Sequence, residues 1–377
     1  MKHDLEKGRP ESAQNATNNN NKAKAKAKAL KQLAQSFAFA TIFFVFSVFV
    51  LTERGAWYKT HQWLVGINFI PSTAVNQLEM FNPSTFDPPT IDRELEIAAK
   101  LGMNTARVFL HDLLYSPDFL DRVDVFLGIT KKHGIKPLLV LFDSCWGPYP
   151  KAGKQESPIP GVHNSRWVMS PGLHALVDKS QHARLEQYVR GVIRRFKNDD
   201  RILGWDIWNE AENGMSPENL IIISDLIDKS FQWARQEGVT QPLTTCLMGG
   251  DSLNFSAFQM MQINNSDILS FHLYSSAHET LVDISKLSRF NRPILLTEWL
   301  ARPHCTVSEI LPLAKKHKIG IFNWGLVDGK TQTKYPYDSI GHPYDHEPDP
   351  WHHDLFHKDG SAYSDEEVQL FQKYINE

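Results

Sequence analysis

Two glutamates, 88 residues apart, each close a short apolar segment of the sequence. Glu210 ends the run GWDIWNE, and Glu298 lies in PILLTEW. A carboxylate within so much apolar sequence is costly to bury unless it has a task, although either glutamate alone could be a solvated surface residue. Two carboxylates roughly 5–5.5 Å apart perform retaining glycoside hydrolysis, in which one attacks the anomeric carbon and the other protonates the leaving oxygen. The pair therefore predicts nucleophilic and acid–base chemistry of this kind.

Further polar and aromatic residues stand at or just after the ends of other apolar segments. The carboxyl ends of parallel strands meet on one face of a barrel, so these side chains should converge on one cavity. The candidates for substrate binding are Arg107, His111, Asp143, Trp146, Asn209, His272, Tyr274 and Trp324. Cys145 is single and directly follows an apolar segment, so we expect a cavity-wall residue rather than a nucleophile.

The elements that would position these residues alternate from Trp57 onward. Most of the short β-rich segments are continuous apolar runs, as expected for parallel strands covered on both faces. The eight expected strands are 63–69, 104–110, 136–142, 202–208, 242–248, 267–273, 292–299 and 319–325. Eight strands alternating with helices predict an α/β fold, a single (β/α)8 TIM barrel. A doubly wound sheet is the rival fold, but no Gly-rich phosphate loop follows the first strand.

Amphipathic helices are expected between the strands. The clearest covers 182–197, with apolar residues at i, i+3, i+4, i+7 and i+8. Others cover 90–102, where Gly102 suits a left-handed cap, and also 220–234 and 307–317.

Two segments without such patterns are unusually long. Residues 143–180, which follow the third strand, are rich in Pro, Gly and aromatic residues, and residues 328–351 follow the eighth. Loops after barrel strands lie on the face that carries active sites, so both are expected near the cavity.

The sequence resembles the clan A glycoside hydrolases, particularly family 5, with its cellulase-, xylanase- and mannanase-like members. The resemblance rests on WDIWNE at 205–210, on His272 and Tyr274, on TEW at 297–299, and on Arg107 and Trp324. It covers essentially the whole barrel. One difference is Asp143-Ser144-Cys145-Trp146, where family 5 commonly has an Asp-x-His unit.

The resemblance implies a role for each matching residue. Glu210 would be the acid/base, and Asn209 would bond the sugar 2-hydroxyl. Glu298 would be the nucleophile, held by Arg107 and Tyr274. His272 would line the same subsite, and Trp324 would be the platform under the sugar.

The pKa values of the two glutamates should differ if these roles are correct. Burial and the charge of Glu298 should raise the pKa of Glu210, which must hold a proton. The guanidinium of Arg107 should lower the pKa of Glu298, which must stay ionised.

The amino-terminal residues predict targeting rather than folding. Residues 1–31 have a charge surplus of +5, and we expect them to form a disordered tract. Residues 32–52 carry no charge, and 21 helical residues reach roughly the ~30 Å of a hydrocarbon core. We expect a transmembrane signal anchor that holds a catalytic domain, residues 53–377, outside the cytoplasm in the cell envelope. The alternatives are a cleaved signal peptide with secretion, and a buried helix.

Composition excludes several other classes of protein. The net charge is −3 overall and −8 beyond residue 31, so nucleic acid is not an expected partner. Three scattered cysteines are too few for a disulfide framework or a Cys-type zinc site. The histidines of 342–357 have no HExxH spacing, so no metal site is predicted there.

The sequence therefore predicts a membrane-tethered, retaining glycoside hydrolase that needs no cofactor and acts on β-linked oligo- or polysaccharides. Two alternatives remain open. The same glutamates could serve a transglycosylase with a sugar hydroxyl as acceptor, or the barrel could bind carbohydrate without turning it over.

Overall fold

The computed structural model describes residues 61–249 and 254–376 of the chain. Within them a parallel sheet of nine strands has the order β5-β4-β3-β2-β1-β9-β8-β7-β6. The strands are β1 Val65–Asn68, β2 Thr105–Phe109, β3 Lys136–Asp143, β4 Gly204–Asn209, β5 Leu243–Thr244, β6 Cys246–Met248, β7 Leu269–His272, β8 Ile294–Trp299 and β9 Gly320–Trp324.

Strands β5 and β6 together occupy one place in the barrel. Only Thr245 separates them, β5 pairs with β4, and β6 pairs with β7. The side chain of Thr245 donates a hydrogen bond to the carbonyl of Trp208 instead of continuing the ladder. The expected strand 242–248 is therefore present but broken at its centre, and the predicted (β/α)8 barrel is confirmed.

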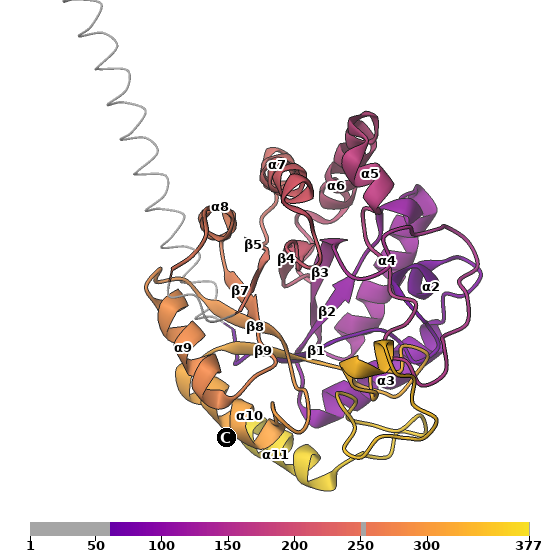
Figure 1. The fold of residues 1–377 in the computed structure, drawn as a ribbon, viewed down its shortest axis with the longest axis vertical. Coiled ribbons are helices and arrows are strands. Elements are labelled where there is room, and N and C mark those ends of the chain that lie inside the picture. The colour runs from indigo at the N-terminus through magenta and orange to yellow at the C-terminus, as the bar shows by residue number, and fades with distance from the viewer. Residues whose placement is uncertain (1–60, 250–253, 377) are drawn as a thin grey trace, which may run out of the picture. The chain divides into compact units, whose positions relative to one another are not determined.

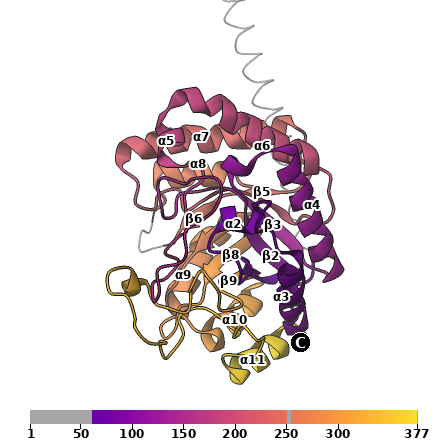
Figure 2. The same cartoon turned by 90° about the vertical axis from the view of Figure 1, so that its right-hand side faces the viewer.

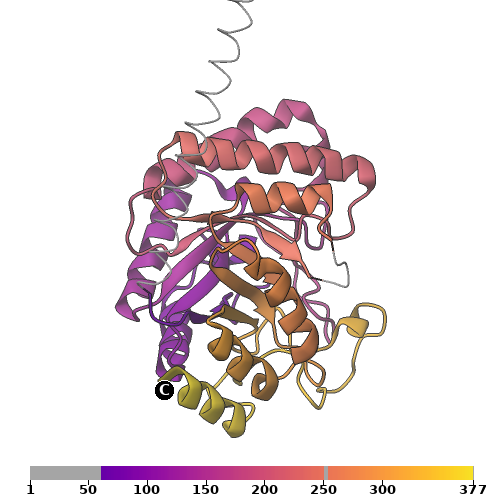
Figure 3. The ribbon, with the colours of Figure 1, turned by 90° about the vertical axis from the view of Figure 1, so that its left-hand side faces the viewer.

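Helices surround the strands in the three ribbon views (Figures 1, 2 and 3). The α-helices are α2 Gln77–Phe81, α3 Pro88–Leu101, α4 Pro117–Lys132, α5 Leu173–Val177, α6 His182–Phe196, α7 Pro217–Gln236, α8 Ala257–Asn265, α9 Ala277–Ser288, α10 Val307–His317 and α11 Asp365–Asn376. Short 3-10 turns cover Asp112–Leu114, Lys179–Gln181 and Tyr337–Ile340.

The helix boundaries follow from capping residues. Asp87 accepts a hydrogen bond from the backbone N–H of Thr90 and starts α3, and Ser116 and Ser216 do the same for α4 and α7. Gly102 ends α3 at φ +98°, a left-handed conformation that glycine adopts without steric cost. The apolar face expected for 182–197 is the buried face of α6.

Apolar side chains fill the barrel interior at the amino-terminal ends of the strands. A ring of buried apolar residues from the amino-terminal half of the barrel forms one cluster: Leu64, Leu138, Leu203, Ile268, Leu295 and Phe322. Such a packed layer supports side chains above it and leaves no channel. The polar side chains at the carboxyl ends of the strands therefore rest on a rigid floor.

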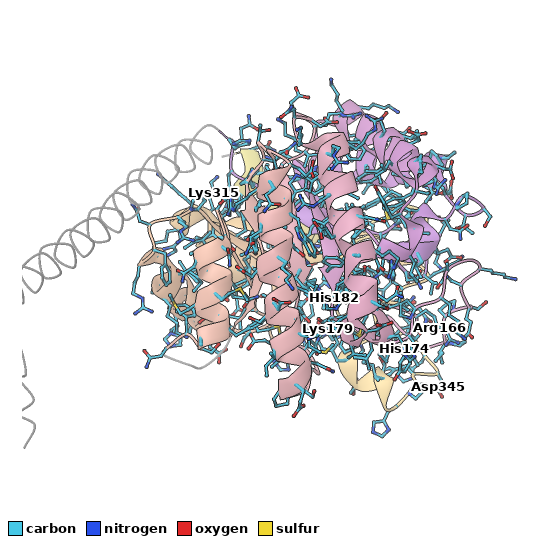
Figure 4. All side chains as sticks on the ribbon, turned by 90° about the horizontal axis from the view of Figure 1, so that it is seen from above. Arg166, His174, Lys179, His182, Lys315 and Asp345 are labelled. Carbon is cyan, nitrogen blue, oxygen red and sulfur yellow. The ribbon has the colours of Figure 1, made fainter. Side chains whose placement is uncertain are left out.

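Two long loops extend from this carboxyl-end face. The β3 loop, residues 144–172, and the β9 loop, residues 325–364, meet through backbone hydrogen bonds such as that from Asn164 N to the carbonyl of Thr331, at 2.7 Å. In the view from above, Arg166 of the β3 loop and Asp345 of the β9 loop lie on the same side of the barrel (Figure 4). The remainder of the segment expected to be a long loop forms α5 and a 3-10 turn.

The expected tract at 1–31 and the expected anchor at 32–52 lie outside the described residues. Among the helices that the structure describes, none combines the length and the apolar composition needed to span a membrane.

Candidate active site

Glu210 and Glu298 meet at the carboxyl-end face of the barrel. Glu210 directly follows β4, and Glu298 lies near the end of β8. Three atoms lie within 4.8 Å of one another: a carboxylate oxygen of Glu210, a carboxylate oxygen of Glu298 and a ring nitrogen of His272. They face a cavity of about 190 Å³, lined by Cys145, Trp146, His163, Asn164, Trp167, Asn209, Glu210, Tyr274, Glu298, Trp324 and Tyr337.

Two neighbours fix the carboxylate of Glu298. Arg107 Nη1 donates to Oε1 at 2.8 Å, and the hydroxyl of Tyr274 donates to Oε2 at 2.7 Å. With one oxygen bound by each neighbour, the side chain is held in one rotamer. The expected contacts of Arg107 and Tyr274 with Glu298 are therefore present.

Arg107 is wholly buried and is itself held by a second acid. Its Nε and Nη2 donate to Asp206 Oδ2 at 3.0 and 2.7 Å. Asp206 was not among the residues predicted for the site. The sequence did carry a signal, since Asp206 is an acidic residue between the apolar residues Trp205 and Ile207 of β4, where a buried charge requires a partner.

Glu210 has a different environment from Glu298. His272 Nδ1 lies 2.8 Å from Oε1, while the side chains of Asn213 and Cys145 donate to Oε2 at 2.7 and 3.1 Å. Its backbone adopts φ +43°, a left-handed conformation that is strained for a non-glycine residue. This conformation turns the side chain out of the strand ladder and into the cavity.

The pKa values of the two glutamates run opposite to the expectation from sequence. Burial tends to raise the pKa of Glu210, but hydrogen bonds and charge from His272, with Cys145 and Asn213, lower it to about 2. Burial raises the pKa of Glu298, and Glu210 adds to this effect against His272 and Arg107. The prediction did not include a cation beside Glu210, and this is the physical reason for the difference.

His272 is that cation. Burial alone would lower its pKa, but contact with Cys246, Glu298 and Glu210 raises it well above the ordinary value. Its Nδ1 lies 2.8 Å from Glu210 and 3.5 Å from Glu298. In this arrangement, His272 and Glu210 share one proton as a pair, and the proton rests on the imidazole.

Asn209 is oriented from both ends of its amide. Its Oδ1 accepts from Arg107 Nη2 at 2.7 Å, and its Nδ2 donates to Asp143 Oδ1 at 2.8 Å. Asp143 also accepts from Trp167 Nε1 at 2.6 Å, and burial raises its pKa to about 7. Asp143 does not line the cavity, so its observed contacts orient Asn209 and Trp167.

The remaining predicted residues divide into two groups. Trp146, Tyr274 and Trp324 line the cavity, and Trp324 packs edge-on against Trp167 at 5.6 Å between ring centres. His111 is completely buried outside the cavity lining, where its Nδ1 accepts from the backbone N–H of Leu113.

The sequence prediction missed the loop residues of the wall. His163, Asn164, Trp167 and Tyr337 reach the cavity from the β3 and β9 loops. They stand far from any strand end, and only their place in loops on the active face indicated them.

One cluster in the described residues could hold a metal ion. It consists of Glu210, His272 and Glu298, whose donor atoms converge. The guanidinium of Arg107 already supplies a positive charge 2.8 Å from Glu298. A divalent cation would therefore compete with Arg107 and with the proton on His272.

Comparison with curated proteins finds mannosidases. The chain is 23% identical over 224 residues to mannan endo-1,4-beta-mannosidase A of Emericella nidulans, covering 54% of this chain and 55% of that protein. It is 23% identical over 252 residues to probable mannan endo-1,4-beta-mannosidase A-1 of Aspergillus terreus, and this match covers 59% of this chain and 61% of that protein. The chain thus spans less than two thirds of these relatives. No family model matches.

Solved structures with the same fold include the exo-beta-1,4-mannosidase Op5Man5 from Opitutaceae bacterium strain TAV5. It matches with a TM-score of 0.58 and 17% sequence identity, and the match covers 84% of this chain and 59% of that one. GH5_18 from Streptomyces cattleya has a TM-score of 0.58 at 11% identity, covering 84% and 80%. The endo-beta-1,4-mannanase of Thermotoga petrophila matches with a TM-score of 0.55 and 14% sequence identity, and the match covers 85% of this chain and 77% of that one.

These comparisons confirm the resemblance to family 5 of clan A. The structural likenesses concern the fold, and the barrel of this chain carries its glutamates after β4 and in β8.

Proposed function

We propose that this family 5-like barrel hydrolyses β-linked glycosides with retention of configuration, with Glu298 as nucleophile and Glu210 as acid/base. The observation that carries the proposal is the separation of the two carboxylates, whose nearest oxygens lie within 4.8 Å. Retaining enzymes place these groups about 5–5.5 Å apart, whereas inverting enzymes leave about 6.5–9.5 Å for a water molecule.

The first step forms a glycosyl-enzyme. Glu298 attacks the anomeric carbon, the bond to the leaving oxygen breaks, and Glu210 gives a proton to that oxygen. The resting proton lies on His272, which donates it along the 2.8 Å contact to Glu210 as the leaving oxygen gains charge. The imidazole becomes neutral in this step.

The second step releases the sugar. Glu210, now ionised, takes a proton from water, and the water oxygen attacks the anomeric carbon and displaces Glu298. The proton passes back from Glu210 to His272, which restores the resting state. The displaced carboxylate returns to the hydrogen bonds of Arg107 and Tyr274. Asn209, fixed by Arg107 and Asp143, is placed to bind the hydroxyl next to the reacting carbon.

β-1,4-Mannosides are the first substrates to test. Both curated relatives are named as mannan endo-1,4-beta-mannosidases, which supports this sugar and linkage. Aryl β-mannosides, β-glucosides and β-xylosides would compare the sugars on one leaving group.

We also propose that residues 32–52 anchor the chain in a membrane, with residues 1–31 in the cytoplasm and the catalytic domain, residues 53–377, on the outer side. A cleaved leader would give a secreted enzyme instead. Protease treatment of intact cells, followed by carbonate extraction of their membranes, separates these two locations.

Azide rescue tests the assignment of the two glutamates. Glu210→Ala should lose most activity on poor leaving groups, and azide should restore turnover with a β-glycosyl azide as product. Glu298→Ala should give the α-azide by a single inversion. An α-azide from Glu210→Ala would reverse the roles, and an inverted product from the wild type would contradict the retaining mechanism.

The matched control is Glu212→Ala, which removes a half-buried glutamate two residues beyond Glu210 that does not line the cavity. It should keep wild-type turnover. Adding an acceptor sugar distinguishes hydrolysis from transglycosylation, because only transfer yields a longer saccharide. A folded wild-type protein without turnover on any of the substrates would support a silent binding barrel.

A further inference from the structure

The β3 and β9 loops join above the barrel and form a wall of the active-site cavity. Asn164 N donates to the carbonyl of Thr331 at 2.7 Å, and Tyr344 N donates to the carbonyl of Gly161 at 3.0 Å. The side chain of Gln332 adds bonds to the β3 loop at both ends of its amide. Two loops joined at several points make a closed wall rather than two separate flaps.

His163 lies at the centre of this wall. Its backbone N–H donates to Ser339 Oγ at 2.9 Å, and its Nδ1 contacts the carbonyl of Tyr335 at 2.8 Å. Its ring packs against Tyr337 and His353 at 4.8 and 5.3 Å between ring centres. Burial lowers the pKa of His163 to about 3, so the ring is neutral and the wall carries no charge there at ordinary pH.

The space inside the wall suits one sugar. The cavity volume of about 190 Å³ lies below the ~300–1,000 Å³ of pockets that bury drug-sized ligands. We therefore expect the cavity to enclose one pyranose ring of the substrate, with the remaining sugars outside it.

The mechanism fixes which sugar this is. Glu298, with a side chain 7% exposed, must reach the anomeric carbon of the enclosed sugar. Glu210 must reach the oxygen that leaves, and the rest of the substrate has to lie beyond it. Trp146 lines the cavity and is 45% exposed, so it marks the open side, while His163 and Asn164 are 3% and 4% exposed and mark the closed side.

Asn164 provides an unused polar atom at the closed side. Its Oδ1 is buried and has no hydrogen-bond partner among the described residues. Its φ of +47° is a left-handed conformation that asparagine tolerates better than most residues. A buried acceptor without a hydrogen-bond partner is unfavourable, and a sugar hydroxyl in the cavity would satisfy it.

We infer that this enzyme acts from the chain end: it removes one sugar at a time from the non-reducing end of a β-linked oligosaccharide, and Asn164 recognises a hydroxyl of that terminal sugar. This inference rests on the proposed function, since a glycosidase must exist before its mode of attack can be assigned. An internal sugar would have to continue through the joined loops, and the wall prevents this.

Labelled hexasaccharides test the mode of attack. Full-length wild-type protein is incubated with β-1,4-linked hexasaccharides of mannose, glucose and xylose, each carrying a fluorescent label at the reducing end. The labelled pentasaccharide should appear first, followed by the tetrasaccharide, with a monosaccharide as the only unlabelled product. Labelled di- or trisaccharides as first products would overturn the inference and leave the proposed function intact. No cleavage of any substrate, including aryl monosides, would overturn both.

A second test concerns Asn164 alone. On p-nitrophenyl β-glycosides of the accepted sugar, loss of the 3- or 4-hydroxyl should lower kcat/KM of the wild type by about tenfold, the equivalent of one neutral hydrogen bond. The same loss should have little further effect on Asn164→Ala, because the partner is already absent. An equal effect on the variant and the wild type, for both hydroxyls, would contradict recognition by Asn164.

The matched control is Asn291→Ala. Asn291 has a φ of +50° and is exposed, so the substitution reproduces the backbone cost of replacing a left-handed asparagine away from the cavity. It should leave kcat/KM and the response to the deoxy substrates unchanged.

Discussion

Replacing Arg107 by methionine should destabilise the barrel and also shift the pH profile of catalysis. The side chain is completely buried and donates five hydrogen bonds, two of them to Asp206 and one to Glu298. Arg107→Met removes the ion-pair partner of buried Asp206 and one of the two cations beside Glu298, which costs about 3–5 kcal/mol of unfolding free energy. With a urea dependence near 3 kcal/mol per molar, the unfolding midpoint should fall by roughly 1–2 M.

Catalysis reports on Glu298 separately from stability. Loss of an adjacent guanidinium raises a carboxyl pKa by about 1–3 units. Glu298 must be ionised to attack, so the acidic limb of kcat/KM should move to higher pH by that amount. Arg107→Met/Asp206→Asn should recover part of the stability, since the unpaired charge of Asp206 is then removed, but should not restore the acidic limb.

Urea unfolding and kcat/KM profiles on an aryl glycoside measure both effects. Arg194→Met is the matched control, because Arg194 bonds Glu237 through two nitrogens at the surface, with a side chain 64% exposed. Its midpoint and pH profile should equal those of the wild type. A wild-type acidic limb in Arg107→Met would refute the role of Arg107 in ionising Glu298. An unchanged midpoint would refute the reasoning on the buried charges.

Three further predictions concern other parts of the molecule. The pKa of His163 is lowered to about 3 and that of His352 to about 4, below the value near 6.5 in an unfolded chain. Between the folded and unfolded pKa values the unfolded state binds more protons than the folded state. The stability that each neutral histidine contributes is therefore full above pH 6.5 and is lost as pH falls. For His163, the loss of unfolding free energy between pH 6.5 and pH 5 should be about 2 kcal/mol. Urea unfolding of wild type and His163→Gln across this range isolates the effect, and parallel curves would contradict it. Cys145→Ser should keep most activity because a hydroxyl can still donate to Glu210, whereas Cys145→Val should lower kcat by about tenfold on poor leaving groups; equal kcat for the two folded variants would argue against that bond. The fragment 53–377 should fold and retain full kcat/KM, and an inactive fragment beside an active full-length chain in detergent would contradict this prediction.

The sequence alone predicted the elements and their order. Apolar runs at 136–142 and 319–325 became β3 and β9, and the amphipathic pattern at 182–197 became α6. These predictions succeed because burial repeats along the chain with the period of the local structure. Every strand of a parallel barrel points the same way, so Glu210 and Glu298, which lie at the carboxyl ends of two strands, were expected on the same face.

The pairing of side chains across the barrel could not be derived from local patterns. His272 lies 62 residues from Glu210 along the chain, and Cys145 lies 65 residues from it. Both hydrogen-bond to this carboxylate, and His272 reverses the expected direction of its pKa. His111 shows the opposite case, because a histidine just beyond a strand end looked available for substrate and is instead buried as a cap.

Chain order, local period and residue type thus determined that this protein forms a barrel with two glutamates on its active face. The tertiary structure alone decided how far apart the carboxylates lie, which cation faces each of them, and how the β3 and β9 loops close the cavity. Distances and dielectric environment depend on contacts between residues far apart in sequence, such as Asn164 and Thr331. The pKa of a buried group and the size of a pocket follow from those contacts.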